Sequence, residues 1–205
     1  TLTLANPISI NSGNFGGQGQ GNVDTGTFVF DGAITLNSDS ALSFIAESNG
    51  SNEQALTYNI NGVIADADNT ASLQIEGGGF ATSSSIVNIT GGLDIGGNLL
   101  LVNDTNLGTL TTNLNSTATN ANVTIGADTT LAGSGTLTYN LNGSTADLID
   151  NNGTLDITSL TLAITEGATG ATSPVYIIAD NGDGTLTGAT FANVTGTPVG
   201  YTLDY

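Results

Sequence analysis

The chain contains no lysine, arginine, histidine, cysteine, methionine or tryptophan among its 205 residues. Lysine and arginine together normally supply about a tenth of a protein's residues, so their complete absence is a selected property. With 18 acidic residues and no basic side chain, the formal net charge is −18 at pH 7. Each carboxylate must therefore be hydrated, hydrogen-bonded or balanced by a cation from solution.

These absences exclude several classes of function. Phosphates of nucleic acids and of anionic lipids find no positive side chain, so we expect no nucleic-acid partner. Serine and threonine have no histidine or lysine base to activate them, and zinc has no nitrogen or sulfur ligand. The longest apolar runs, such as residues 99–102, are too short to span a membrane. We therefore expect no enzyme activity, no catalytic, cofactor-binding or metal-binding residues, and no direct membrane insertion.

The same absences indicate where the protein works. A surface without lysine or arginine offers nothing to a trypsin-like protease, and one without thiols or thioethers resists oxidants. The first residues carry no basic leader, so a secreted protein would be seen here in its mature form. We expect an extracellular or cell-surface protein that is secreted and processed.

What the chain does contain is a regular series of short alternating segments. Apolar residues recur at every second position with Thr or Asn between them, which is the pattern of a half-buried strand. Asn-Gly, Asp-Gly and Gly-Gly pairs separate the segments and are typical of turns. No window shows a helical stripe, so the sequence predicts an all-β protein. The clearest segments are residues 27–30, 34–36, 56–60, 86–89, 93–95, 123–125, 155–157 and 160–164.

Short strands, frequent turns and internal repetition favour a right-handed parallel β-helix, in which each coil buries its inward residues against its neighbours. The alternative is a β-sandwich, or two in tandem joined near residues 103–121. Two sections resemble each other and indicate an internal duplication of about 27–102 and 122–205. Ile34–Leu42 matches Val123–Leu131, and Leu56–Gly62 matches Leu137–Gly143.

The beginning of the chain differs from this repetitive β domain of residues 27–205. Residues 1–10 predict an apolar strand, and glycine is frequent from Gly13 to Gly26. Such a stretch is typical of a flexible linker, so residues 1–26 are interpreted as a strand on a tether that could pair with a neighbouring subunit. The alternative is a first strand followed by a long loop of the same subunit.

Calcium is the one cofactor that the sequence raises, and only weakly. Asn181-Gly182-Asp183-Gly184 resembles the middle of a calcium loop, but Ala179 and Thr190 occupy positions where acidic ligands belong. We favour a hairpin turn between residues 176–178 and 186–187. Close acidic pairs also occur, but without a sugar-stacking tryptophan they give little support for glycoside hydrolysis. These pairs are Asp66/Asp68, Asp147/Asp150 and Asp180/Asp183.

From about Val123 onward, the chain resembles secreted bacterial proteins with autotransporter-associated β-strand repeats, which often end in a PEP-CTERM sorting tail. The resemblance extends from there to Tyr205 and implies a secreted β-helical passenger or matrix protein without catalytic residues. The chain shows no sorting helix, which departs from that pattern. The segments that carry the resemblance are residues 126–137, 141–143, 146–149, 176–180, 186–191 and 198–205.

Two functions remain open from the sequence. The first is a structural protein whose partners are copies of itself, assembled into a filament, sheath or surface layer by strand addition or by stacking of coils. The second is a monomeric adhesin or carbohydrate-binding passenger, with a groove of clustered Tyr, Asn and Asp and with glycans as partners. Aromatic residues make up only 5% of the chain, which weakens the second.

Overall fold

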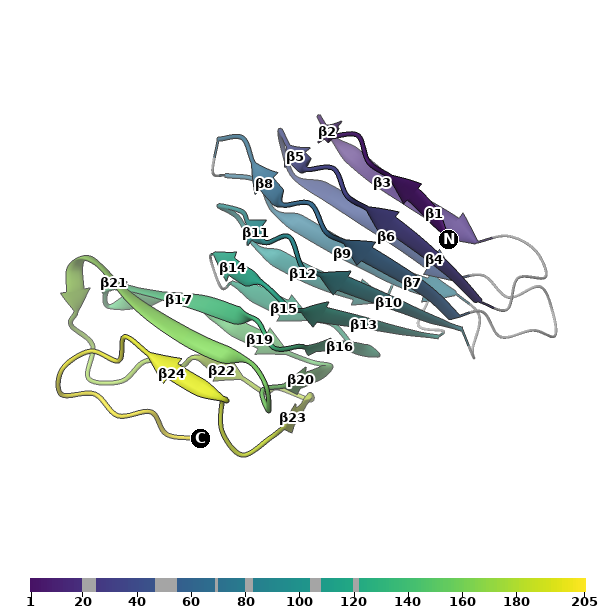
Figure 1. Cartoon of the computed structure of the whole chain (residues 1–205). Helices are drawn as coiled ribbons and strands as arrows, with labels where there is room; N and C mark the ends of the chain where they lie inside the picture. The colour runs from purple at the N-terminus through teal and green to yellow at the C-terminus, as the bar shows by residue number, and fades with distance from the viewer. Residues whose placement is uncertain (20–24, 47–54, 69, 80–82, 104–107, 120–121) are drawn as a thin grey trace.

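The chain forms a parallel β-helix with three faces, as the computed structural model shows (Figure 1). The structure describes residues 1–19, 25–46, 55–68, 70–79, 83–103, 108–119 and 122–205. Within these residues all regular structure is β-strand. The prediction of an all-β parallel β-helix is confirmed. The sandwich alternative is wrong, because the strands at residues 109–114 and 117–119, where two sandwiches would be joined, pair in parallel with strands of both the preceding and the following coil.

Each coil contributes one strand to each face, except that the last coil has no strand in the third sheet among the described residues. The first sheet contains β1 (Leu2–Leu4), β4 (Thr25–Phe30), β7 (Ala55–Ile60), β10 (Ser84–Ile89), β13 (Thr109–Leu114), β16 (Thr129–Ala132), β20 (Thr154–Asp156) and β23 (Thr185–Thr187). The second contains β2 (Ile8–Ile10), β5 (Ile34–Leu36), β8 (Ile64–Asp66), β11 (Leu93–Asp94), β14 (Thr117–Thr119), β17 (Thr136–Gly143), β21 (Thr161–Ala171) and β24 (Asn193–Thr195), with β18 (Thr145–Ala146) antiparallel to β17. The third contains β3 (Gly13–Gly19), β6 (Ser40–Ala46), β9 (Leu73–Gly79), β12 (Leu99–Asn103), β15 (Val123–Ile125), β19 (Ile149–Asn151) and β22 (Ala179–Asp180).

The core consists of columns of inward side chains that continue from coil to coil. In the first sheet one column begins at Leu2, and its last two members are Leu155 and Leu186. Its interior members from Tyr58 to Leu155 are fully buried, whereas Leu2 is 54% exposed and Leu186 39% exposed. The column runs through Leu2, Phe28, Tyr58, Val87, Thr112, Leu131, Leu155 and Leu186.

Outward side chains form hydrogen-bonded ladders along the same direction. The Asn88 amide donates to Asn59 Oδ1 at 2.8 Å, and the Asn113 amide donates to Asn88 Oδ1 at 2.8 Å. At the corner between the first and second sheets, the Asn61 amide donates to Asp31 Oδ1 at 2.8 Å. These ladders link successive coils on the outside as the apolar columns do on the inside.

The glycine-rich beginning of the chain is not the flexible linker that we expected. Gly13–Gly19 is strand β3, in register with β6, while residues 20–24 lie outside the described residues. A Cβ atom on Gly16 would lie 1.9 Å from the carbonyl oxygen of Ser43, so glycine permits the strands to approach. Residues 1–10 belong to the first coil of the same chain, where β1 pairs with β4 and β2 with β5.

The two sections that match in sequence lie on different faces. Ile34 is in the second sheet and Val123 in the third, and Leu56 is in the first sheet and Leu137 in the second. The duplication stays a prediction, and the repeat that the fold displays is the single coil. Coil length varies, because the step along the chain from Leu155 to its partner Leu186 is much longer than the step from Thr112 to its partner Leu131.

Candidate functional site

The acidic pairs of the sequence serve local structure. Asp66 accepts hydrogen bonds from the backbone N–H groups of Asp68, Ala71 and Gly96, at 3.0, 2.5 and 3.3 Å. Burial acts to raise the pKa of the Asp66 carboxyl, but these donors outweigh it and hold that pKa below its usual value. Asp147 accepts from the backbone N–H of Asn140 at 2.8 Å. Both carboxylates thus act as acceptors that fix the turn or strand beside them.

The turn at Asn181–Gly184 was predicted to be a hairpin, and that detail is wrong. The Gly184 N–H donates to the Asn181 carbonyl at 2.7 Å, as a tight turn requires. However, the turn joins β22 of the third sheet to β23 of the first, so it is a corner of the solenoid. The Asn181 side chain accepts a hydrogen bond from the buried amide of Asn151 at 2.5 Å. Among the described residues no three acidic, histidine or cysteine side chains are grouped as metal ligands.

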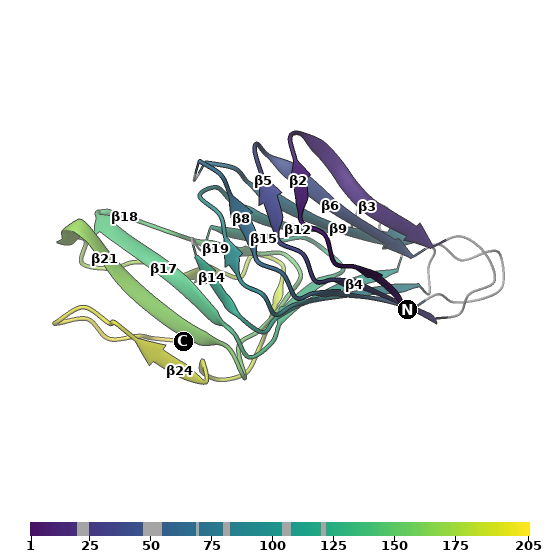
Figure 2. The ribbon, with the colours of Figure 1, turned by 45° about the horizontal axis from the view of Figure 1, so that its top comes forward.

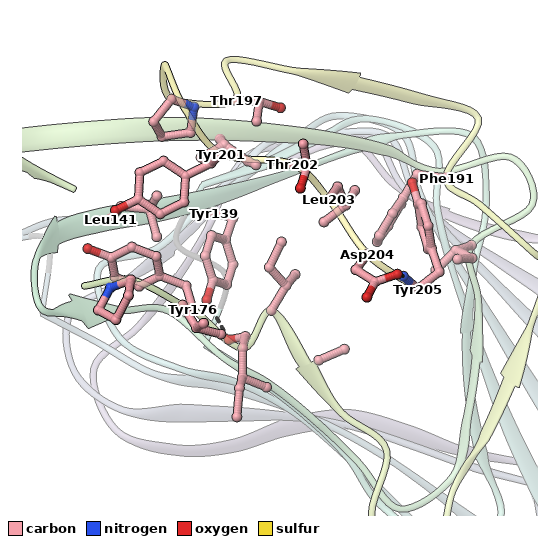
Figure 3. A pocket seen from close by; sticks show the side chains of 18 of the residues that line it. Tyr139, Leu141, Tyr176, Phe191, Thr197, Tyr201, Thr202, Leu203, Asp204 and Tyr205 are labelled. Carbon is pink, nitrogen blue, oxygen red and sulfur yellow. Dashed lines mark hydrogen bonds between the residues drawn. The ribbon is translucent and has the colours of Figure 1, made fainter. Parts of the chain in front are cut away.

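A cavity of about 520 Å³ lies at the C-terminal end of the solenoid, between the last coils and residues 197–205. Figure 3 shows Tyr139, Tyr176 and Tyr201 at one end of this cavity and Phe191 and Tyr205 at the other. Leucine and isoleucine make up half of the remaining lining, and several of them belong to the end of the core. We call this space the C-terminal cavity.

Hydrogen bonds from tyrosine to the backbone fix one wall of the C-terminal cavity. The Tyr139 hydroxyl donates to the Ile177 carbonyl at 2.6 Å, and the Tyr201 hydroxyl donates to the Ser173 carbonyl at 2.5 Å. The Tyr176 hydroxyl donates to the Gly143 carbonyl and accepts from the N–H groups of Thr172 and Ser173. The rings of Tyr176 and Tyr201 lie with centroids 5.8 Å apart. The wall is therefore formed before any ligand arrives.

Tyr139 and Tyr201 of this wall are neutral at physiological pH, because the pKa of each is raised. Burial, together with the nearby Asp147 carboxylate and Tyr176, raises the pKa of Tyr139 to about 12. Burial and the neighbouring Tyr176 also raise the pKa of Tyr201. Asp204 is the one carboxylate in the lining, and the chain supplies no basic residue.

No site was expected from the sequence, so the C-terminal cavity was missed. Four of the five tyrosines of the chain line it, although they are spread from Tyr139 to Tyr205. Their concentration in the last third of the chain was the available signal. It was uninformative without the fold, because only the coil register brings β17, residues 174–178 and residues 197–205 together.

The two ends of the solenoid are the other candidate surface. Figure 2 shows the coils following one another along the stack, with the two chain ends in opposite terminal coils. Strands β1, β2 and β3 at one end, and β22, β23 and β24 at the other, each pair on one side only among the described strands.

No helix of the described residues is long and apolar enough to cross a membrane. Comparison with protein-family models, with curated proteins and with solved structures finds no match for this chain.

Proposed function

We propose that the chain is a non-catalytic extracellular structural protein that self-assembles head to tail, by stacking of coils, into a filament, sheath or surface layer. The observation that carries the proposal is the apolar column of the first sheet, which ends at exposed Leu2 on one side and at exposed Leu186 on the other. Stacking Leu2 of one molecule on Leu186 of the next continues the column and removes both side chains from water.

The strand edges support the same arrangement. All pairs between consecutive coils are parallel, and the first and last strands of each sheet run in that common direction. A second copy placed head to tail therefore continues the first and second sheets, beyond β23 and β24, with the same geometry that holds the coils together. A head-to-tail contact uses different surfaces on the two partners, so each added copy presents a new free end, and the contact generates a filament when the rotation between copies does not close a ring.

The distribution of charge supports head-to-tail contact over contact between two C-terminal ends. Residues 1–23 contain no acidic side chain, whereas Asp180, Asp183 and Asp204 lie near the other end. A neutral end meeting an acidic end avoids the repulsion that two acidic ends would experience. The net charge of −18 still repels whole molecules, so we expect assembly to require moderate salt or calcium.

An extracellular location is part of the proposal. A chain without lysine, arginine, cysteine or methionine resists trypsin-like cleavage and oxidation, which are hazards of an external structural material. The resemblance of the chain from about Val123 onward to secreted bacterial β-repeat proteins supports the same location.

The test uses two variants with one damaged end each, Leu2→Asp and Leu186→Asp, at high protein concentration with moderate salt and calcium. The wild type should form filaments visible by electron microscopy. Each variant should stay monomeric, because stacking would bury an unpaired carboxylate. An equimolar mixture of the two should give dimers by sedimentation, since each variant keeps one intact end.

Thr3→Asp is the matched control, because Thr3 lies on the same strand but faces outward between Leu2 and Leu4. It should assemble like the wild type. A wild type that remains monomeric under these conditions contradicts the proposal. Leu186→Asp keeps only its N-terminal end intact. If this variant alone forms dimers, the contact joins two N-terminal ends and the head-to-tail arrangement is wrong.

A further inference from the structure

The C-terminal cavity is preorganised and has the size of a small-molecule site. Its volume of about 520 Å³ lies within the ~300–1,000 Å³ typical of ligand pockets. Its tyrosine wall is fixed by hydrogen bonds to backbone carbonyls at Gly143, Ser173 and Ile177. A ligand therefore does not have to order these side chains, which removes part of the cost of binding.

The charges around the cavity argue against an ionic ligand. An anion would meet Asp204, would find no cation anywhere among the side chains and would approach a molecule of net charge −18. A cation would have to leave water for a lining dominated by leucine, isoleucine and aromatic rings. Burying an ionised group among apolar side chains is strongly unfavourable, and the exposed Asp204 is a single partner for it.

The hydrogen-bonding groups argue against a sugar. A buried sugar hydroxyl needs a partner, and leaving one unpaired costs about 1–3 kcal/mol. The hydroxyl protons of Tyr139, Tyr176 and Tyr201 are already directed to backbone carbonyls. Among the lining side chains this leaves Thr197, Thr202, the Tyr205 hydroxyl and the Asp204 carboxylate (Figure 3). Three of the four lining tyrosines thus offer ring faces rather than free hydroxyl protons.

We propose that the C-terminal cavity binds an uncharged, predominantly apolar small molecule between its two aromatic ends. Leu186 belongs both to the cavity lining and to the end of the apolar column. The site does not depend on the proposed assembly, and it is tested at protein concentrations at which sedimentation shows monomers.

The probe is Nile red, which is uncharged and fluoresces in apolar surroundings. Titration of the monomeric wild type should show one saturable site per chain and a raised melting temperature. Leu203→Trp places a larger side chain into the cavity and should weaken binding at least tenfold. Leu203 packs partly buried against the core. Val199→Trp is the matched control, since Val199 is fully exposed on the same segment and does not line the cavity, and it should bind normally.

Two further variants separate obstruction of the cavity from other effects. Thr202→Phe obstructs the cavity from a more exposed position, in case Leu203→Trp does not fold by circular dichroism. Leu2→Asn removes apolar surface at the opposite end and should leave Nile red binding unchanged.

The proposal is overturned if the wild type shows no saturable binding, or if Val199→Trp weakens binding as much as the obstructing variants do. It is also overturned if a neutral saccharide raises the melting temperature while Nile red does not, or if an alkyltrimethylammonium ion binds more tightly than Nile red. Fluorescence that rises only with the assembled fraction would identify the cavity as a contact between copies of the chain and would overturn the proposal as well.

Discussion

At the scale of single residues, two buried hydroxyl groups in neighbouring strands have opposite roles. The Ser85 hydroxyl in β10 donates to the Phe44 carbonyl at 2.6 Å, and Ser85 is fully buried. Thr112 in β13 is also fully buried, but its hydroxyl has no hydrogen-bond partner among the described residues. A buried polar atom without a partner costs free energy, whereas a satisfied one contributes to stability.

Replacement of Thr112 by valine should therefore stabilise the protein. Thr112→Val keeps the shape and removes the unpaired hydroxyl, so we expect the free energy of unfolding to rise by about 1 kcal/mol. Ser85→Ala is the contrasting variant and should lower it by about 1 kcal/mol. Chemical denaturation measures both. A Thr112→Val variant that is less stable than the wild type would show that the hydroxyl has a partner, such as a buried water.

At the scale of elements, the corner between the first and second sheets depends on stacked glycines. A Cβ atom on Gly62 would lie 2.1 Å from the Gly32 carbonyl oxygen, and one on Gly32 would lie 2.1 Å from the Asn6 carbonyl oxygen. The missing side chains let the corners of consecutive coils lie directly on one another. The restriction is steric, because the obstructing atoms are backbone and cannot rotate away.

Gly62→Ala should consequently be among the most damaging small substitutions in the chain. We expect a loss of ~3 kcal/mol, because the corners of two coils must separate to admit one methyl group. Gly26→Ala is the control, since its Cβ would meet side-chain atoms and no backbone, with Leu56 Cδ2 at 3.1 Å and Phe28 Cε2 at 3.9 Å. Thermal unfolding of the two variants makes the comparison. Similar melting temperatures would show that the corner can shift without cost.

The strands also show which parts of the fold could be predicted from the sequence alone. Alternation of apolar residues predicted strands such as β5 and β15 at their observed bounds. The predicted turn pairs Asp31-Gly32 and Asn61-Gly62 directly follow β4 and β7. The sheet to which each strand belongs could not be predicted, because coils of unequal length have no fixed period. Gly13–Gly19 was misinterpreted because glycine composition is the same for a linker and for a strand in close contact.

At the scale of the whole molecule, one continuous apolar core contains two fully buried tyrosines. Tyr58 stacks on Phe28 with ring centroids 5.1 Å apart, and Tyr139 forms part of the wall of the C-terminal cavity. Burial raises the pKa of Tyr58 to about 12, and burial is also the main cause of the raised pKa of Tyr139. The folded state thus holds both protons more tightly than the unfolded chain does.

This difference predicts alkaline destabilisation. Below pH 10 these two tyrosines are protonated in both the folded and the unfolded chain, so the stability that the protonated, buried side chains give to the fold is fully present. Between pH 10 and about 12 the unfolded chain releases these protons first, so stability should fall as pH rises. The melting temperature, followed together with tyrosinate absorbance, measures the effect. Tyr58→Phe should reduce the pH dependence, and an unchanged slope in this variant would show that Tyr58 ionises without unfolding.

The unequal coils have a mechanical consequence. In a stack where each coil holds only its neighbours, tension applied to the chain ends releases one coil at a time from an end. At ~3.4 Å per extended residue, the coil from Thr112 to Leu131 yields ~65 Å of slack and the coil from Leu155 to Leu186 yields ~105 Å. Under tension the molecule would lengthen in steps of different size. The order of those steps would show whether unfolding begins at the N-terminal or the C-terminal coil.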